Sequence, residues 1–338
     1  MLIQLEKNCN NTQLEAITLE LRDNGYKVSL VETLNGRYLV CNGSRETDIR
    51  HFGNKAGVKD VHVVEDDNKL VSRKWKVKDP EIHFKDGSSV SRNDLTIVMG
   101  PCSVENEEQV INTVEFLKEN NIGFMRGGIF KPRSSPYSFR GLGIEGLKYF
   151  SAHCRANGIK VVTEVMQVSQ IEPMYDYVDI YQVGARNSQN YNLLDELGKT
   201  DKPVLLKRGM SVTLHELLAS AEYIFSNGNE NIILCERGIR TFEKSYRNTM
   251  DLNAIPYLRD KSHLPVFSDP SHGVGIRNYV GSLALASVMA GADGVMVEIH
   301  KCPQRAFSDG DQTLDFYQAG RLIERLRETY RLRKSMAL

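Results

Sequence analysis

The chain lacks an excess of either charge. Among its 338 residues, 43 lysines and arginines balance 43 aspartates and glutamates. Such a balance gives no overall attraction to nucleic acid or to an anionic membrane. We therefore expect no nucleic-acid partner, and any local cluster of basic residues requires a local explanation.

The sequence also lacks segments suited to a membrane or to secretion. Its longest uncharged stretch, residues 278–292, is too short and too rich in glycine and serine to cross a bilayer. The first residues, MLIQLEKNCNNTQLEA, do not resemble a secretory signal, because no cationic start precedes an apolar run. The six cysteines include no CxxC pair, which is typical of reduced thiols rather than of a disulfide framework. We expect a cytoplasmic protein without a membrane partner.

Residues 1–66 alternate between strand and helix patterns and predict a small first domain. Asn35-Gly36, between the second and third strand patterns, signals a two-residue hairpin turn. A helical pattern and a short polar helix separate the strands, so the order βαββαβ predicts a ferredoxin-like fold. The expected strands are 2–6, 26–32, 37–42 and 58–65, and the first helix is 11–24.

Residues 67–94 predict a linker and a hairpin. The segment DDNKLVSRKWKVKDP is highly charged and has no helical period. The following IHFKDGSSVSR has the pattern of a hairpin that turns at Asp86-Gly87. We place a domain boundary here.

Residues 95–338 alternate short apolar runs with amphipathic helical stretches, which predicts parallel strands joined by crossover helices. Eight such units are typical of a (β/α)8 barrel in an α/β protein. A doubly wound open sheet is the alternative, but it usually has fewer strands and would require a glycine-rich fingerprint where this chain has GPCSVE. The expected strands are 95–100, 122–127, 159–165, 178–184, 203–209, 231–237, 264–270 and 294–300.

A polar or ionisable side chain follows every predicted barrel strand. Because the loops after the strands converge on one mouth of a barrel, these side chains are expected to meet there. A single cation at such a place is more often a solvated charge or part of a structural ion pair. Four cationic loops favour instead a ligand with phosphate or carboxylate groups. Their cations are Arg126, Lys131, Arg133, Arg186, Lys207, Arg208 and Arg237.

Four further side chains from separate loops have the chemistry of a metal site: Cys102, His272, Glu298 and Asp309. A thiolate, an imidazole and two carboxylates suit a divalent transition metal with an open position. No fixed spacing marks the set, so a buried hydrophobic cysteine and a hydrogen-bonded His272–Glu298 pair remain the alternatives. Lys207 has a second interpretation, because a lysine at a strand end can form a Schiff base with a carbonyl substrate.

Eight stretches of the chain resemble, in order, the motifs of 3-deoxy-D-arabino-heptulosonate 7-phosphate (DAHP) synthases, in the form with an N-terminal ferredoxin-like domain. The related 3-deoxy-D-manno-octulosonate 8-phosphate synthases carry a KANRTS-like stretch where this chain has KPRS. Ser134 stands where threonine is common in DAHP synthases and keeps the hydroxyl. The stretches are GPCSVE (100–105), RGGIFKPRSSPYSF (126–139), GARN (184–187), LLKRG (205–209), CERGIRTFE (235–243), DPSHGVG (269–275), VEIH (297–300) and SDG (308–310).

The resemblance implies a transferase that condenses phosphoenolpyruvate with D-erythrose 4-phosphate and water, releasing phosphate. This is the first step of the shikimate pathway to aromatic amino acids. It also implies one divalent ion, Mn2+ before Fe2+, Co2+ or Zn2+, held by Cys102, His272, Glu298 and Asp309. The alternatives are condensation with arabinose 5-phosphate and a Schiff-base aldolase that uses Lys207.

The resemblance further assigns roles to substrate-binding residues. Lys131 would donate a proton, Glu164 would position a water, and Cys102 and His272 would take part through the metal. The phosphate of phosphoenolpyruvate would be held by Arg186 and Lys207, its carboxylate by Arg126, Lys131 and Arg237, and the phosphate of the aldose by Arg133 and Ser134, with Pro132 and Ala185 also in contact with substrate.

For the first domain, the resemblance implies feedback control by tyrosine or phenylalanine and assembly into a homotetramer. A packing or assembly element is the alternative for this domain. A regulatory or binding protein with an inactive barrel is the alternative for the whole chain, although the complete set of strand-end residues speaks against it.

Overall fold

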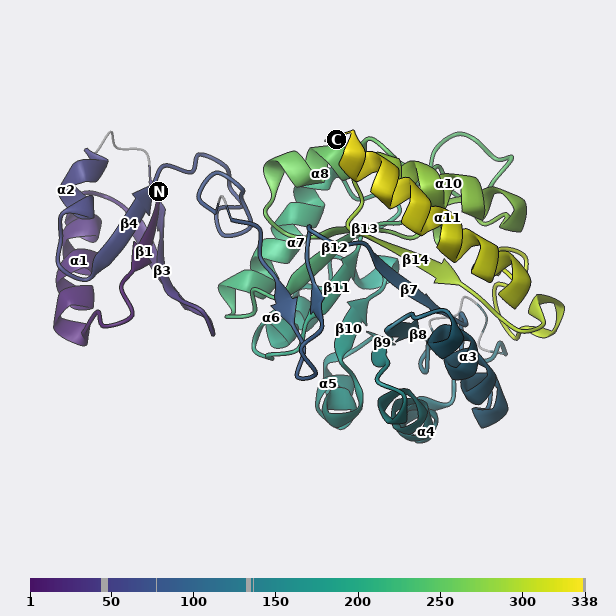
Figure 1. Ribbon diagram of the computed structural model, residues 1–338. Coiled ribbons are helices and arrows are strands. Elements are labelled where there is room, and N and C mark those ends of the chain that lie inside the picture. The colour runs from purple at the N-terminus through teal and green to yellow at the C-terminus, as the bar shows by residue number, and fades with distance from the viewer. Residues whose placement is uncertain (44–47, 77, 132–134, 136, 337–338) are drawn as a thin grey trace.

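The structure is a computed structural model that describes residues 1–43, 48–76, 78–131, 135 and 137–336. A four-stranded antiparallel sheet lies near the N-terminus, and a closed barrel of eight parallel strands follows it (Figure 1). Both parts of the predicted fold class are therefore confirmed. The boundaries predicted at residues 66 and 94 remain predictions.

The first sheet has the strand order β2-β3-β1-β4, with each neighbour antiparallel, as the βαββαβ pattern predicts. Two helices cover one face (Figure 1), and their buried Ile17, Leu21 and Phe52 pack against Ile3 and Leu39 of the sheet. The elements are β1 (Leu2–Leu5), α1 (Asn11–Asp23), β2 (Lys27–Glu32), β3 (Arg37–Asn42), α2 (Ile49–Gly53) and β4 (Val58–His62).

The turn between β2 and β3 differs in detail from the expected Asn-Gly turn. The backbone N–H of Thr33 donates to the carbonyl of Gly36 at 2.8 Å, so Leu34 and Asn35 are the central residues. The hydroxyl of Thr33 accepts the backbone N–H groups of Asn35 and Gly36. Gly36 is needed for close approach instead, since a Cβ there would lie 2.8 Å from the hydroxyl oxygen of Tyr38.

The other face of the first sheet packs toward the barrel. Tyr38 of β3 makes edge-to-face contacts with Trp75 of the linker and with Phe225 of the barrel, with ring centroids 5.3 and 6.1 Å apart. At the tip of the β2–β3 hairpin, the Thr33 hydroxyl donates to Glu230 at 2.8 Å. These contacts dock the sheet beside the N-terminal end of barrel strand β12 (Ile232–Glu236).

The predicted hairpin after the linker closes that same end of the barrel. Its strands β5 (Ile82–His83) and β6 (Ser89–Val90) pair across the turn at Asp86-Gly87. Ile82 and Val90 are buried against residues inside the barrel, among them Phe124 and Ile180. Because the hairpin fills this end, a substrate must enter from the opposite one.

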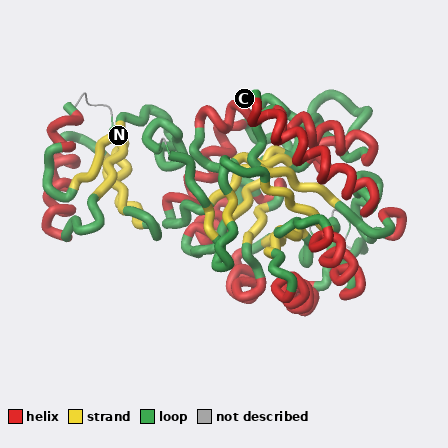
Figure 2. The backbone as a smooth tube through the Cα atoms, in the orientation of Figure 1, coloured by secondary structure: helices red, strands yellow, loops and turns green. Residues whose placement is uncertain are grey.

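All eight predicted barrel strands are present, and they close in the order β10-β11-β12-β13-β14-β7-β8-β9. Helices surround them on the outside (Figure 2). The other strands are β7 (Thr96–Gly100), β8 (Phe124–Arg126), β9 (Lys160–Val165), β10 (Ile180–Val183), β11 (Val204–Lys207), β13 (Val266–Ser268) and β14 (Gly294–Glu298). The helices are α3 (Glu107–Glu119), α4 (Gly143–Ala156), α5 (Ile171–Met174), α6 (Tyr191–Gly198), α7 (Leu214–Ser226), α8 (Ala254–Lys261), α9 (Pro270–Val274), α10 (Arg277–Met289) and α11 (Phe316–Ser335).

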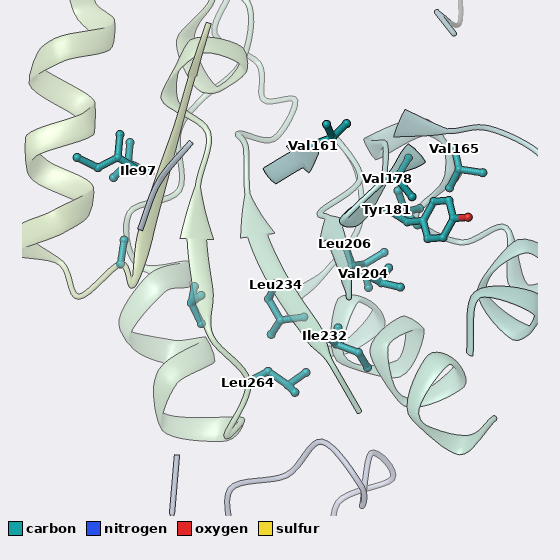
Figure 3. Close-up of a cluster of buried hydrophobic side chains, with 14 of the residues drawn as sticks. Ile97, Val161, Val165, Val178, Tyr181, Val204, Leu206, Ile232, Leu234 and Leu264 are labelled. Carbon is teal, nitrogen blue, oxygen red and sulfur yellow. The ribbon is translucent and has the colours of Figure 1, made fainter. Parts of the chain in front are cut away.

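The barrel strands are buried on both faces, which explains their continuous apolar runs. Val204 and Leu206 belong to the large core between strands and helices, part of which is drawn in Figure 3. Leu205, between them in sequence, belongs to a separate cluster inside the barrel. None of the helices in the described part of the chain is long and apolar enough to cross a membrane.

Candidate active site

The two-residue period of the strands places the functional side chains. Phe124, Val162, Ile180, Leu205 and Met296 lie inside the barrel. Successive side chains of a strand alternate between its faces, so a residue two positions later faces the barrel axis at the next layer toward the open end. The residues at those positions are Arg126, Glu164, Gln182, Lys207 and Glu298. The apolar filling of the barrel therefore changes to charged and polar residues within one layer.

A pocket of about 690 Å³, including its open mouth, lies at this end of the barrel. Six lysines and arginines line it, which supports the prediction of a ligand with several negative charges. Its lining residues are Arg126, Lys131, Glu164, Gln182, Gly184, Ala185, Arg186, Lys207, Met210, Arg237, Arg247, His272 and Asp309.

Nine of the predicted site residues are thus gathered at one pocket, and two more, Cys102 and Glu298, lie buried beside it. The predicted Pro132, Arg133 and Ser134 lie outside the described residues. The predicted roles of all these residues are taken up as proposals below.

Three of the four predicted metal ligands form a tight group. One donor atom each from Cys102, Glu298 and Asp309 lies within 4.8 Å of the others. His272 is outside this group but close to it, since its Nε2 atom is 3.4 Å from Glu298 Oε1. A thiol, an imidazole and two carboxylates combine soft and hard donors, and this set fits a divalent transition metal.

His272 is oriented by a buried carboxylate. Its Nδ1 atom is 2.7 Å from Asp269 Oδ2, which leaves Nε2 on the side of Glu298. A carboxylate behind the second ring nitrogen is the usual support of a metal-binding histidine. Burial acts to raise the pKa of Asp269, but the neighbouring His272 and Lys207 outweigh it and hold that pKa well below its usual range.

Lys207 is the second partner of Asp269. Its Nζ atom donates to Asp269 Oδ2 at 2.5 Å, and both side chains are nearly inaccessible to water. A buried ion pair of this kind is strongly coupled, because removing either partner leaves an unpaired charge. Lys207 therefore lies at the pocket as a partner of the buried Asp269 carboxyl group.

Glu298 is also held by a cation. Arg126 Nη1 donates to Glu298 Oε1 at 2.8 Å and to the carbonyl of Pro101 at 2.7 Å. Burial would raise the pKa of Glu298, yet His272 and Arg126 lower it below the ordinary value. The Nε atom of Arg126 is buried and has no hydrogen-bond partner among the described residues, which leaves one donor at the pocket for a ligand.

Cys102 is buried beside Lys131. Lys131 Nζ donates to the Cys102 carbonyl at 2.9 Å and lies 3.2 Å from its sulfur. Burial and the charge of Glu298 raise the pKa of the thiol to about 11. The thiol therefore carries a proton at neutral pH, and binding of a divalent cation to the sulfur would displace that proton.

Arg186 and Arg237 have no carboxylate within 4.0 Å in the described part of the chain, although both line the pocket. Arg237 is almost completely buried, and burial lowers the pKa of its guanidinium. A buried cation without an anionic partner is costly. An anionic ligand at the pocket would supply that partner. By contrast, Arg208, another cation of these loops, is ion-paired with Glu236 and Asp251.

Glu164 lies against a glycine of the GARN stretch. A Cβ atom at Gly184 would be 2.0 Å from Glu164 Oε1, so only glycine allows the carboxylate to lie there. Both residues line the pocket. This contact gives a physical reason for the glycine of that stretch.

Sequence reasoning missed three residues of the site: Met210, Arg247 and Gln312. Met210 and Arg247 line the pocket, and Gln312 donates to Glu298 Oε2 at 2.6 Å. Arg247 lies within a long loop and not at a strand end, so the strand period did not point to it. Gln312 follows Asp309 by three residues, and this nearness in sequence to a predicted metal ligand was the only indication that it belongs to the site.

Together, the barrel and this pocket have the form of an enzyme site, with cations suited to a phosphorylated or carboxylated ligand beside a group of potential metal donors. Comparison with known proteins makes the assignment specific. The chain belongs to the DAHP synthetase I family, whose model matches residues 80–334.

Individual relatives agree with this assignment. The chain is 47% identical over 260 residues to a phospho-2-dehydro-3-deoxyheptonate aldolase of Thermotoga maritima, in an alignment that covers 77% of each chain. It is 35% identical over 265 residues to a 2-dehydro-3-deoxyphosphooctonate aldolase of Syntrophobacter fumaroxidans, covering 73% of this chain and 91% of that one.

Solved structures extend the similarity to the first domain. A crystal structure of the DAHP synthase of Thermotoga maritima has a TM-score of 0.77 and 40% identity, covering 97% of this chain and 96% of that one. A truncated form of the Thermotoga maritima 3-deoxy-D-arabino-heptulosonate 7-phosphate synthase has a TM-score of 0.72 and 44% identity, covering 77% of this chain and 95% of that one. The family resemblance read from the sequence is confirmed.

Proposed function

We propose that this chain condenses phosphoenolpyruvate with D-erythrose 4-phosphate and water to give DAHP and phosphate. The observation that carries the proposal is one pocket lined by six cations, with a thiol, an imidazole and two carboxylates at or beside it. The identity to a heptonate aldolase is 47%, against 35% for a phosphooctonate aldolase, and this difference favours the four-carbon aldose over arabinose 5-phosphate.

The cations of the pocket would bind phosphoenolpyruvate. Arg186, without a carboxylate partner among the described residues, and Lys207 are assigned to its phosphate. Arg126, Lys131 and Arg237 are assigned to its carboxylate, and the free Nε donor of Arg126 supports this part. Fixing both ends of the substrate orients its C3 atom toward the second substrate, which lowers the entropic cost of reaction.

The same residues would move the protons. The new bond joins C3 of phosphoenolpyruvate to the aldehyde carbon, and Lys131 donates a proton to the aldehyde oxygen as negative charge develops there. The attack leaves positive character at C2, and Glu164 would orient the water that adds to this carbon and accept its proton. The resulting hemiketal phosphate then releases phosphate and leaves the ketone.

Cys102, His272, Glu298 and Asp309 would hold the divalent ion, for which we propose Mn2+, with Fe2+, Co2+ and Zn2+ as alternatives. When bound, the ion would polarise the aldehyde oxygen as a Lewis acid. The positions of Lys131 and Asp309 around Cys102 support this placement, since the Asp309 carboxylate is 3.1 Å from the sulfur.

The Schiff-base alternative is less well supported. The Nζ atom of Lys207 is ion-paired with Asp269, and a covalent adduct would leave that buried carboxylate without its partner. Borohydride reduction in the presence of substrate separates the two mechanisms. Under the metal-dependent mechanism, borohydride should trap no covalent adduct between Lys207 and substrate. A trapped adduct on Lys207, together with turnover that persists in a chelator, would favour the Schiff-base mechanism.

Loss of phosphoenolpyruvate absorbance tests the proposed reaction directly. Turnover is expected with erythrose 4-phosphate and not with arabinose 5-phosphate, and EDTA should abolish it until Mn2+ is added. Equal turnover with both aldoses, or full turnover in EDTA, would contradict the proposal.

For the first domain we propose feedback control by tyrosine or phenylalanine within a homotetramer. Support comes from its separate core, which includes Ile3, Leu39 and Phe52, and from its docking on the barrel through Tyr38 and Thr33. Inhibition of the full-length enzyme by either amino acid, and loss of that inhibition after removal of residues 1–66, would be the expected result.

A further inference from the structure

Gln312 connects the proposed metal ligands to the loop between β12 and α8, which carries Arg247. Its side-chain Nε2 donates to Glu298 Oε2 at 2.6 Å, and its Oε1 accepts from Arg247 Nη1 at 2.9 Å. A carboxylate can only accept and a guanidinium can only donate, so these two partners fix the orientation of the amide. Gln312 is 2% exposed, which leaves it little freedom to move.

Arg247 contacts the second carboxylate of the group. The same Nη1 atom lies 3.2 Å from Asp309 Oδ1. Arg247 and Gln312 thus form a continuous bridge between Asp309 and Glu298. Neither is placed as a metal ligand itself, because a guanidinium has no acceptor atom and the amide oxygen is already used.

The bridge is anchored at both ends by backbone contacts. Asp309 has a φ of 51°, in the left-handed region, and the backbone N–H of Gln312 and the hydroxyl of Thr313 both donate to its carbonyl. On the other side, the backbone N–H of Arg247 donates to the carbonyl of Val274 in α9, the helix that carries His272. The bridge therefore links segments that carry three of the four proposed ligands.

Electrostatics gives the bridge a purpose. The donor atoms of Glu298, Asp309 and Cys102 are within 4.8 Å of one another, and two carboxylates at that distance repel. Glu298 Oε1 is fixed by Arg126, but Oε2 and Asp309 Oδ1 are fixed by Gln312 and Arg247. Without the bridge, the carboxylates would be free to separate before a cation arrives.

We propose that Gln312 and Arg247 are positioning residues that preorganise Glu298 and Asp309 for metal binding, an inference that rests on the metal site proposed above. Hydrogen-bond partners behind metal ligands typically change metal affinity or activity by about 10–100-fold when removed. The bridge accounts for the burial of a glutamine amide next to the pocket and for an arginine of a long loop that reaches the site.

Equilibrium binding of Co2+ to the full-length, metal-stripped protein tests the proposal without measuring activity. Gln312→Leu should weaken Co2+ binding by about 10–100-fold and alter the visible absorption of the bound ion, because Glu298 Oε2 loses its donor. Gln304→Leu is the matched control, since Gln304 is exposed in the same loop and should bind Co2+ as the parent does.

Arg247→Met keeps the test decisive if Gln312→Leu does not fold. The Arg247 side chain is 40% exposed, so its loss should leave the fold intact, and we expect Co2+ binding about tenfold weaker. Gln312→Glu keeps the size of the side chain but sets an acceptor against Glu298, and it should also bind Co2+ more weakly.

Two outcomes would overturn the proposal, and only the second would also refute the proposed metal site. Parent-like Co2+ affinity and spectrum in folded Arg247→Met and Gln312→Leu would refute the bridge and leave the metal site standing. A parent chain that binds no Co2+ would refute the metal site and the bridge together.

Discussion

Both ends of the barrel bury charged side chains, but they satisfy them differently. At the end closed by the hairpin, the guanidinium of Arg92 donates to the backbone carbonyls of Ser262 and Leu264, and Glu222 accepts two backbone N–H groups of the linker. The Arg92 guanidinium also lies 3.6 Å from Asp79 and 3.9 Å from Asp293, so its partners all belong to the chain itself. The charges at this end fix how the linker and hairpin fit the barrel.

At the open end, the charges meet other side chains from different loops. Arg126 pairs with Glu298 and Lys207 with Asp269, while Arg186 and Arg237 have no carboxylate partner among the described residues. Charged groups with spare donors in a pocket are suited to a ligand, and this is where perturbed groups indicate function. Charge indicates an active site at the open end because donors that line the pocket, such as Arg126 Nε, have no partner among the described residues.

Lys131→Met should give the largest effect and act on activity alone. It removes the proposed proton donor, so kcat should fall by about 100- to 10,000-fold with phosphoenolpyruvate and erythrose 4-phosphate. The urea midpoint should change little. Lys148→Met, at an exposed position of α4, is the control and should keep both values. A Lys131→Met enzyme with parental kcat would remove Lys131 from the mechanism.

Arg92→Met should do the reverse at the closed end. The Arg92 side chain is 2% exposed, and burial lowers the pKa of its guanidinium to about 10, so it is still charged at neutral pH. Its loss leaves carbonyls of Ser262 and Leu264 without donors, and we expect a loss of about 3 kcal/mol in the free energy of unfolding. Activity per folded molecule should stay parental. An Arg92→Met variant with parental stability and reduced kcat would contradict the assignment of a purely structural role to the closed end.

Gly184→Ala should have a smaller effect, confined to the open end. The added Cβ would displace the Glu164 carboxylate, which lies 2.0 Å from that position. If Glu164 orients the attacking water, kcat should fall by about 10–100-fold, less than for loss of the proton donor. Glu164→Gln should give a similar loss, and the double variant should be no worse than the weaker single one. Additive losses would show that Gly184 acts independently of Glu164.

Much of this comparison is readable from the sequence. The eight strands follow from apolar runs, and the positions of Arg126, Lys207 and Glu298 at strand ends predict that they meet at one mouth. These assignments succeed because a parallel barrel buries both faces of each strand and so constrains every position. The same constraint does not extend into loops.

The parts that the sequence did not predict depend on tertiary contacts between loops. Arg247 and Gln312 meet across two connections, and no local pattern brings them together. The hairpin at Asp86-Gly87 was predicted, but its filling of the barrel end was not, since Ile82 and Val90 carry no signal of their partners. Glu222 lies on α7 and gives no sign in sequence that it accepts linker N–H groups.

Substitution of Glu222 gives the smallest predicted change in stability. It is also the most specific prediction, because it states whether stability rises or falls with pH. Burial raises the pKa of this carboxyl from 4.5 to about 7, despite the N–H groups of Leu70 and Val71 that act to lower it. Between those two values the folded state holds a proton that the unfolded state releases, so the stability from this group rises as pH falls from 7 toward 4.5. Asp309 at the open end acts in the opposite sense, because its lowered pKa gives stability that is lost in acid.

The measurement is the thermal midpoint of the parent and Glu222→Gln over a pH range that extends from above pH 8 down to pH 5. The parent should gain a few degrees relative to the variant as pH falls, and the difference should be constant above pH 8, where Glu222 is ionised in both states. Exposed Glu324→Gln, on α11, is the control and should follow the parent throughout. A gap that stays constant down to pH 5 would mean that Glu222 remains ionised in its backbone contacts. The closed end would then stabilise a charge in the same sense as the mouth does.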